Sequence, residues 1–248
     1  MSDVLVEACV DSLASAAAAV EAEARRVELC ASLREGGTTP SAGVLETCRE
    51  RLVAPVFVMI RPRAGDFCYD DGELDVMARD IRVLRGHGAQ GFVFGVLTAE
   101  GDVAHDALER LLDEARPLPV TFHRAFDMAR DREAAFEVLL RCGVDRLLTS
   151  GAAATAIEGV GLIDRLVRRA GRRLTVMAGG GIRAGNAAEV VRRTGVRELH
   201  TGPSIRVDGP MRFRASAARV EKSGADPFAR EVLDGVEVRE IVRAVRGL

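Results

Sequence analysis

Short apolar runs alternate regularly with amphipathic segments along the chain. Eight such runs are rich in β-branched and other apolar residues, a composition typical of buried strands. They cover residues 4–10, 26–30, 56–61, 91–96, 120–124, 146–150, 174–178 and 198–201. Most are followed by a segment with helical spacing of apolar residues, including residues 13–24, 74–85, 107–115, 134–141, 157–170 and 187–193. The chain is therefore predicted to repeat a strand–helix unit.

Eight strand–helix units in 248 residues predict a parallel sheet closed into a (β/α)8 barrel, the TIM barrel fold. A doubly wound sheet is the minor alternative. We expect a single α/β domain over residues 1–248, with the barrel core in residues 1–202 and a C-terminal extension in 203–248. In this extension, residues 203–234 are expected to be irregular and residues 236–245 to form a closing helix.

Composition and charge narrow the class of protein. The chain has 35 basic and 37 acidic side chains, a formal net charge of −2, and 48% hydrophobic residues. A near-neutral charge argues against a nucleic-acid partner. No apolar run approaches the length of about 20 residues that a membrane span needs, and no secretory leader pattern opens the chain. We expect a cytoplasmic protein without a membrane partner.

Several cofactor classes are disfavoured by residues that the sequence lacks. The only lysine, Lys222, lies in the extension, so a strand lysine for Schiff-base chemistry or pyridoxal phosphate is not available. The sequence has neither a Walker-type loop nor a Gly-x-Gly-x-x-Gly loop after the first strand, so no motif points to a nucleotide cofactor. The five cysteines form no Cys-x-x-Cys pair and are odd in number, which favours free thiols.

Polar side chains gather where the predicted strands end. In a (β/α)8 barrel the C-terminal strand ends carry the chemistry, and alternation places residues two apart on one face. Paired charges inside a barrel can also be purely structural, but this set is more polar than a packing layer needs. The candidate catalytic residues are Glu7, Glu28, Arg61, His123, Arg124 and His200.

A glycine run follows the seventh predicted strand, at the position where many barrels bind phosphate. Small residues there allow backbone N–H groups to approach a ligand. Together with Arg61, Arg63 and Arg124 at the ends of the third and fifth strands, this run predicts an anion-binding site. Its candidate residues are Arg63, Gly179, Gly180 and Gly181.

Six sequence strings resemble the CutC copper homeostasis family, in order and along most of the chain. They are Glu-Leu-Cys at 28–30, Gly-Gly-Thr-Thr-Pro-Ser at 36–41, Val-Met-Ile-Arg-Pro-Arg-Ala-Gly-Asp-Phe at 58–67, Thr-Phe-His-Arg-Ala-Phe-Asp at 121–127, Leu-Thr-Ser-Gly at 148–151 and Met-Arg-Phe-Arg at 211–214. The resemblance implies a cytoplasmic TIM barrel that handles copper and self-associates, as a homodimer or a higher homo-oligomer.

Two hypotheses about function stay open at this point. In the first, Cys9 and Cys30 lie on neighbouring strands and provide two soft ligands for a Cu(I) ion, with Met59 as a weak third partner. In the second, the chain is an enzyme for a small phosphorylated or carboxylated substrate. The arginines would hold the anion, and the glutamates and histidines would supply acid–base chemistry.

Overall fold

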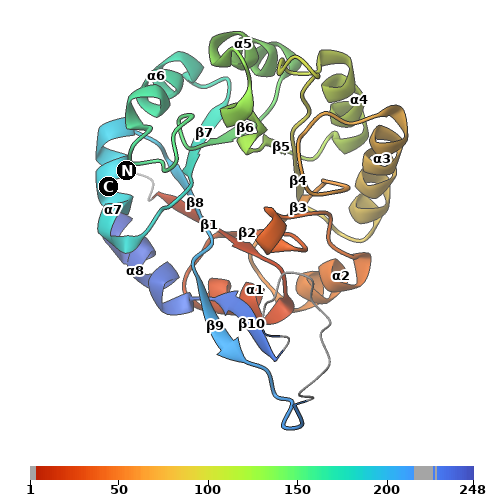
Figure 1. Ribbon diagram of the computed structural model, residues 1–248. Coiled ribbons are helices and arrows are strands. Elements are labelled where there is room, and N and C mark those ends of the chain that lie inside the picture. Colours follow the sequence, from red (N-terminus) through yellow and green to blue (C-terminus); the bar gives the residue numbers. More distant parts are fainter. Residues whose placement is uncertain (1–3, 215–225, 227) are drawn as a thin grey trace.

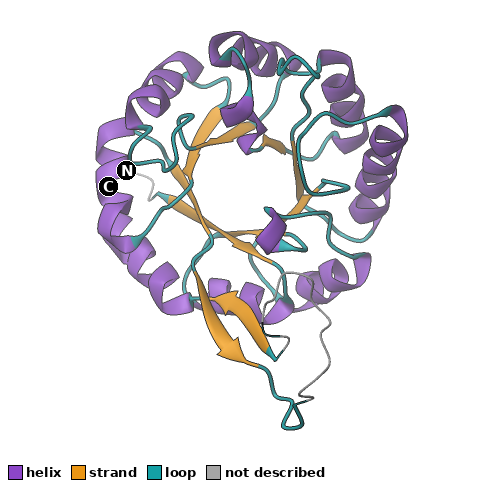
Figure 2. Ribbon diagram, in the orientation of Figure 1, coloured by secondary structure: helices purple, strands orange, loops and turns teal. Residues whose placement is uncertain are grey.

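The structure is a computed structural model that describes residues 4–214, 226 and 228–248. In these residues, parallel strands close into a barrel with neighbours in sequence order from β1 to β8, and β8 pairs with β1 (Figures 1 and 2). The strands are β1 (Leu5–Val10), β2 (Arg26–Leu29), β3 (Val56–Met59), β4 (Gly91–Phe94), β5 (Val120–Phe122), β6 (Arg146–Thr149), β7 (Thr175–Gly179) and β8 (Glu198–Thr201). The predicted (β/α)8 barrel is confirmed.

A ring of helices surrounds the barrel in Figure 2. Its members are α1 (Leu13–Glu21), α2 (Ala42–Arg51), α3 (Asp71–Gly86), α4 (His105–Ala115), α5 (Arg132–Cys142), α6 (Val160–Ala170), α7 (Ala184–Thr194) and α8 (Gly235–Val245). Ser12, Ser41 and Asp131 cap α1, α2 and α5 by accepting backbone N–H groups. Asp70 caps α3 in a capping box with Glu73.

The alternation of strand residues produces two apolar clusters. Outward-facing residues such as Val6, Val27 and Val58 pack under the helices in the main core. A small second cluster of Cys30, Phe57, Met59 and Val93 lies inside the barrel, with Cys9 and Leu33 packed against it. The interior is therefore partly sulfur-rich and apolar, while other inward positions of β1, β2, β6 and β8 carry charge, namely Glu7, Arg26, Glu28, Arg146, Glu198 and His200.

The C-terminal extension is more ordered than the sequence pattern indicated. Strands β9 (Ser204–Asp208) and β10 (Ala229–Leu233) form a two-stranded antiparallel sheet, so our expectation of an irregular segment over 203–234 was wrong. Figure 1 shows this hairpin projecting from the barrel next to α1. Leu233 N–H donates to Ser15 Oγ at 3.2 Å, which fixes β10 to α1. The closing helix is confirmed as α8, whereas Lys222 lies outside the described residues.

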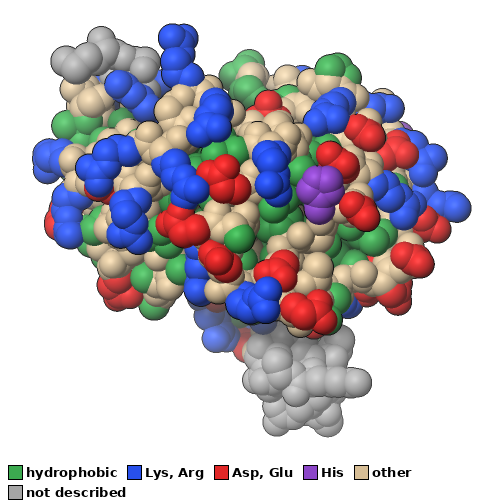
Figure 3. Space-filling model, turned by 90° about the horizontal axis from the view of Figure 1, so that it is seen from above, with side chains coloured by type: hydrophobic (Ala, Val, Ile, Leu, Met, Phe, Trp, Pro, Cys, Tyr) green, Lys and Arg blue, Asp and Glu red, His purple; other side chains and the backbone are tan. Residues whose placement is uncertain are grey.

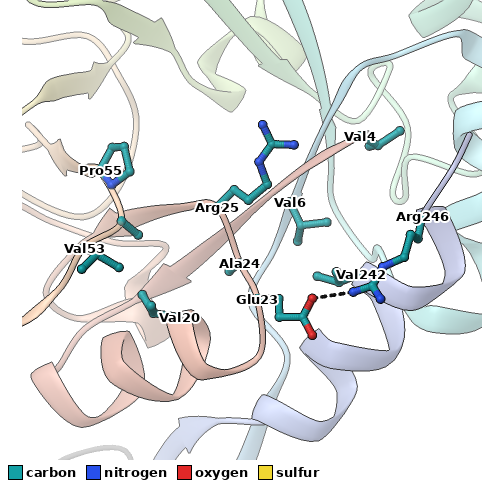
Figure 4. A pocket seen from close by; sticks show the side chains of 11 residues that line it. Val4, Val6, Val20, Glu23, Ala24, Arg25, Val53, Pro55, Val242 and Arg246 are labelled. Carbon is teal, nitrogen blue, oxygen red and sulfur yellow. Dashed lines mark hydrogen bonds and ion pairs between the residues drawn. The ribbon is translucent and has the colours of Figure 1, made fainter. Parts of the chain in front are cut away.

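Charged side chains of both signs cover the outer surface of the barrel in the view of Figure 3. On the face shown in Figure 3, basic and acidic side chains alternate without a patch of one sign. At the N-terminal end of the barrel, a cavity of about 470 Å³ is lined by valines of β1, α1 and α8 and bordered by the Glu23–Arg246 ion pair (Figure 4). None of the described helices combines the length and apolar character that crossing a bilayer requires.

Candidate functional site

A layer of paired charges lies inside the barrel below its C-terminal mouth. The Arg26 guanidinium donates to Glu7 and, at 2.5 Å, to Glu198. Arg146 donates to Glu198 from two nitrogens, at 2.5 and 3.2 Å. Both guanidinium groups stack over the Phe57 ring, 5.0 and 5.4 Å from its centroid. Two cations thus face two carboxylates in a balanced, almost solvent-free layer.

Sulfur, carboxylate and imidazole groups meet directly above this layer. Cys9 Sγ and Cys30 Sγ are 3.7 Å apart, and Cys30 Sγ lies 3.7 Å from Glu28 Oε2. His200 Nδ1 is 2.8 Å from Glu7 Oε1, and its Nε2 is 3.6 Å from Glu28 Oε2. Strand register explains the meeting, because Cys9 pairs with Glu28 across β1–β2 and Glu7 with His200 across β1–β8.

Burial and neighbouring charge shift the pKa of every ionisable group in this cluster. Desolvation alone would raise the pKa of Glu7, but Arg26 and His200 lower it to about 2. Desolvation raises the pKa of Glu28 despite the opposing charge of His200. Burial disfavours the His200 imidazolium, yet Glu28, Cys9 and Glu7 together raise its pKa well above the usual value. His200 is therefore a cation that both carboxylates hold in place.

Both thiols are protonated in this structure at neutral pH. The hydrogen bond with Cys30, and burial, raise the pKa of Cys9 well above its usual value. For Cys30, the hydrogen bond with Cys9 lowers the pKa, but burial and Glu28 outweigh it and bring the pKa to about 11. Glu28 Oε1 has no hydrogen-bond partner among the described residues, although it is buried. The cluster thus presents two neutral thiols and an unused acceptor.

The loop after β2 covers Cys30, and Arg61 holds this loop. Gly37 adopts a φ of +87°, and a Cβ at this position would lie 3.1 Å from Cys30 Sγ and 3.6 Å from Met59 Cε. Arg61 Nη1 donates at 2.9 Å to the carbonyls of Glu35 and Gly37, and its Nη2 donates to Gly65 O at 2.8 Å. The side chain that we expected to hold an anion instead binds three backbone carbonyls.

His123 lies near Arg61 rather than in the cluster around Cys30. Both side chains pack on Phe67, with the ring centroid of His123 at 4.8 Å and the guanidinium carbon of Arg61 at 5.1 Å. Desolvation and Arg61 lower the pKa of His123 to about 3, so the imidazole is neutral. Its Nδ1 accepts from Ala125 N–H at 3.2 Å, which leaves the proton on Nε2. Nε2 has no partner in the described part of the chain.

Arg124 and the glycine run meet at the β5–β6–β7 side of the mouth. Arg124 Nε bonds Asp127 at 2.9 Å and its Nη2 bonds Ser150 Oγ at 2.8 Å, while Nη1 lies next to Gly180. Gly179 packs tightly against the Leu148 side chain. This grouping agrees with the expected neighbourhood of Arg124 and the glycines, but the Nε and one Nη2 donor of Arg124 already have internal partners.

Arg63 and the N-terminus of α7 have internal partners as well. Arg63 Nε donates to Glu73 at 2.5 Å and Nη2 to Cys68 O at 2.8 Å, in the loop before α3. Ala184 N–H, at the start of α7, donates to Glu237 of α8 at 2.9 Å. A carboxylate of the chain itself therefore pairs with Arg63, one of the residues expected to bind an anion, and a second carboxylate bonds the start of the helix after the glycine run.

A cavity of about 1110 Å³ reaches the cluster from outside. Its walls include Cys9, residues 32–35 of the loop after β2, and strand β10 of the extension. Gly202 lies beside Cys9, where a Cβ would be 3.4 Å from Cys9 Cβ. The hairpin and the loop over Cys30 thus form the two sides of an entrance to Cys9.

The structure divides the sequence-predicted residues into groups. Glu7, Cys9, Glu28, Cys30 and His200 form one cluster; Arg61 and His123 form a second; Arg124 and Gly180 form a third, and Arg63 lies on the outer loop. Arg26, which pairs with Glu7, was missed, as were Glu198 and Arg146, which complete the charged layer around Arg26. Arg26 and Glu198 lie two residues before Glu28 and His200, so the alternation of strand side chains places them on the same inward face and could have predicted them.

The fold and this interior cluster define a (β/α)8 barrel with a buried, sulfur-containing polar site at its C-terminal mouth. Distant barrels share the fold alone, such as a phosphoribosylanthranilate isomerase from Thermotoga maritima at 12% identity and TM-score 0.58, covering 99% of this chain and 100% of that chain.

The model of the CutC family matches residues 4–205, and the chain belongs to this family. It is 46% identical over 238 residues to a human copper homeostasis protein cutC homolog, covering 96% of this chain and 87% of the human one. A CutC family protein of Chromobacterium violaceum is 46% identical, with 98% of each chain covered. The crystal structure of a copper homeostasis protein CutC from Streptococcus agalactiae superposes with TM-score 0.76 at 36% identity, covering 79% of this chain and 97% of that chain.

Proposed function

We propose that this chain binds Cu(I) in copper homeostasis through the thiolates of Cys9 and Cys30. The observation that carries the proposal is the 3.7 Å separation of the two sulfur atoms on neighbouring strands. With metal–sulfur bonds of about 2.3 Å, this separation corresponds to a bent S–metal–S unit of about 110°, which leaves room for a third ligand. Soft thiolate and thioether ligands favour Cu(I) over hard cations.

The surroundings of the two thiols support a metal that is held but accessible. Met59 packs in the same interior cluster and provides a thioether, and Glu28 provides the unused carboxylate oxygen. Two thiolates and one Cu(I) carry a net charge of −1, and the nearby His200 imidazolium, which already pairs with Glu7 and Glu28, lowers the electrostatic cost of this charge. The cavity beside Cys9 provides an entry path between the loop and the hairpin.

The proposal includes a cytoplasmic location and a homo-oligomeric state. Two thiols this close persist as thiols in a reducing compartment, which is where we place the chain. Self-association follows the expectation for the family, as a homodimer or a larger homo-oligomer.

Anaerobic titration against a chromophoric Cu(I) chelator tests the proposal. We expect one Cu(I) per chain, and an affinity loss of at least about 100-fold in the Cys9→Ser, Cys30→Ser double variant, because even outer-shell changes cost about 10–100-fold. Cys68→Ser, in the loop after β3, is the matched control and should bind as the wild type does. Equal affinity in the double variant and the wild type would remove the proposal.

The pH dependence of this titration provides a second readout. Both thiols have raised pKa values, that of Cys30 about 11, so each must lose its proton on binding. The apparent Cu(I) affinity should therefore rise by about two orders of magnitude per pH unit between about pH 6 and 9. A flat profile would mean that the thiols do not ligate the metal.

A small-anion enzyme remains a second candidate because of one observation. Arg124 is half-exposed, and its Nη1 lies next to Gly180 at the mouth of the barrel. A guanidinium is a typical binding group for a phosphate or carboxylate, and a glycine beside it lets an anion approach the backbone closely. Binding of inorganic phosphate that depends on Arg124 tests this candidate.

A further inference from the structure

We propose that the outer helical layer carries a second metal site, formed by His105, Glu109 and Cys142, for a borderline divalent cation such as Zn²⁺. His105 is the first residue of α4, Glu109 follows one turn later, and Cys142 is the last residue of α5. The i, i+4 spacing places His105 and Glu109 on one face of α4. One ligand atom from each residue lies within 4.8 Å of the other two.

The histidine is oriented as metal-ligating histidines are. His105 Nδ1 lies 3.2 Å from Asp106 Oδ1, and Nε2 lies 3.8 Å from Glu109 Oε1. A ring nitrogen that donates to a carboxylate leaves the other nitrogen with its lone pair free for a metal. Asp106 therefore acts as the outer-shell partner, and Nε2 is directed toward the Glu109 side of the site.

The donor set and its mobility suit a tetrahedral ion. Ligand atoms around Zn²⁺ lie about 3.3–3.8 Å apart when metal–nitrogen and metal–sulfur bonds are about 2.0 and 2.3 Å. The His105 and Glu109 side chains are 45% and 56% exposed, so small rotations can bring their ligand atoms over the buried Cys142 sulfur. A nitrogen, oxygen and sulfur set selects against the oxygen-binding cations Ca²⁺ and Mg²⁺ and leaves a fourth position to solvent.

Charged groups from both helices surround the site. Glu109 and Asp106 on α4 are acidic, whereas Arg116 donates to the Cys142 carbonyl at 3.0 Å and Arg141 precedes Cys142 on α5. Burial and Glu109 raise the pKa of Cys142, while Arg141 and Arg116 act in the opposite direction. The thiol therefore exchanges a proton for the metal, and two carboxylates attract the cation.

Titration with Co²⁺, a spectroscopic substitute for Zn²⁺, tests this site in the full chain. The Cys9→Ser, Cys30→Ser background isolates it from the site proposed for Cu(I). We expect a sulfur-to-cobalt charge-transfer band and intense visible bands of tetrahedral Co²⁺, which one equivalent of Zn²⁺ abolishes. Cys142→Ala should lose the charge-transfer band, and Asp106→Asn should weaken binding about 10-fold.

Matched variants keep the test decisive. His105→Gln and Glu109→Gln change exposed side chains and leave the core intact, so loss of the visible bands in either variant cannot be attributed to misfolding. His87→Gln is the control, because His87 also faces a carboxylate, Glu46, at 2.6 Å but has no cysteine in its cluster. The proposal is overturned if the double-serine background shows no charge-transfer band, or if Cys142→Ala retains it.

Discussion

The two sides of the barrel mouth use the same residue types in different ways. On the β8–β1–β2 side, Glu7, Glu28 and His200 bond to one another and to the layer of Arg26 below. On the β3–β5 side, Arg61 bonds to three carbonyls of two loops, and the ring of His123 accepts from its own turn. Polar side chains at a strand end can therefore bond to one another in a cluster or hold a loop in place. The outcome depends on which groups of the following loops lie next to them.

This difference decides where chemistry is available. The Cys9–Cys30 side retains exchangeable protons and an unused Glu28 oxygen, next to a cavity. On the other side, the Arg61 amino groups are used to shape the loop that covers Cys30. Arg61, on the β3–β5 side, thus helps to cover the thiols on the β8–β1–β2 side. Such a cover suits the buried metal site that we propose better than an open anion pocket.

The largest effect is expected where the charges depend on one another. Arg26→Met leaves Glu7 and Glu198 without their shared cation, and breaking a buried ion pair from one side costs about 3–5 kcal/mol. The melting temperature should fall by about 6–20 °C. Arg124→Met, at the β5–β6–β7 edge of the mouth and away from this cluster, removes a half-exposed pair and should cost about 1 kcal/mol or less. Calorimetry of both variants measures the contrast.

The pH dependence of this loss has a defined sign. The folded-state pKa of Glu7 is about 2, below its usual 4.5, so its contribution to stability is present above about pH 4.5 and is lost as the pH falls through 2. The difference in melting temperature between the wild type and Arg26→Met should therefore become smaller as the pH falls from about 4.5 to 2. If Arg26→Met and Arg124→Met lowered the melting temperature equally at neutral pH, the two parts of the mouth would not differ in how strongly their ion pairs stabilise the fold.

A smaller effect is expected from the residue that joins the two sides. Arg61→Met removes the donors that hold the carbonyls of Glu35 and Gly37, so the loop over Cys30 opens more often. If the variant loses about 1.4 kcal/mol of the free energy that keeps the loop closed, Cys30 should be alkylated about 10-fold faster. Mass spectrometry of the Cys30 peptide measures this rate. Arg63→Met serves as the control because its partners lie in another loop, and an unchanged rate in Arg61→Met would contradict the covering role.

The fold was predictable because its signal is local. A buried strand followed by an amphipathic helix leaves a pattern in any short window, and the barrel repeats that pattern. The hairpin of β9 and β10 was missed for the opposite reason. Residues of β9 are mostly exposed, so no apolar face marks this strand in the sequence. Its partner also begins about 20 residues further along the chain, so no short turn between two adjacent apolar runs predicts the pairing.

The site was predictable only where alternation along a strand decides the outcome. Glu7 with Cys9, and Glu28 with Cys30, share a face because strand side chains alternate, and strand order then brings them together. The partners of Arg61 were not predictable, since they are backbone carbonyls of Glu35, Gly37 and Gly65. Carbonyls are present at every position, and only the loop conformation selects which of them face a guanidinium.

The smallest expected effect concerns the candidate anion site at Arg124, at the β5–β6–β7 edge of the mouth. Phosphate that binds only the folded chain, at about ten times its Kd, should stabilise it by about 1.4 kcal/mol and raise the melting temperature by about 3–5 °C. Arg124→Ala should abolish this rise because Arg124 Nη1 lies next to Gly180. Arg168→Ala should keep it, since Arg168 lies on the surface of α6 and pairs with Asp164. A rise of equal size in both variants would mean that phosphate acts as a general salt. In that case Asp127 and Ser150 would fully occupy Arg124, and both sides of the mouth would be closed to anions.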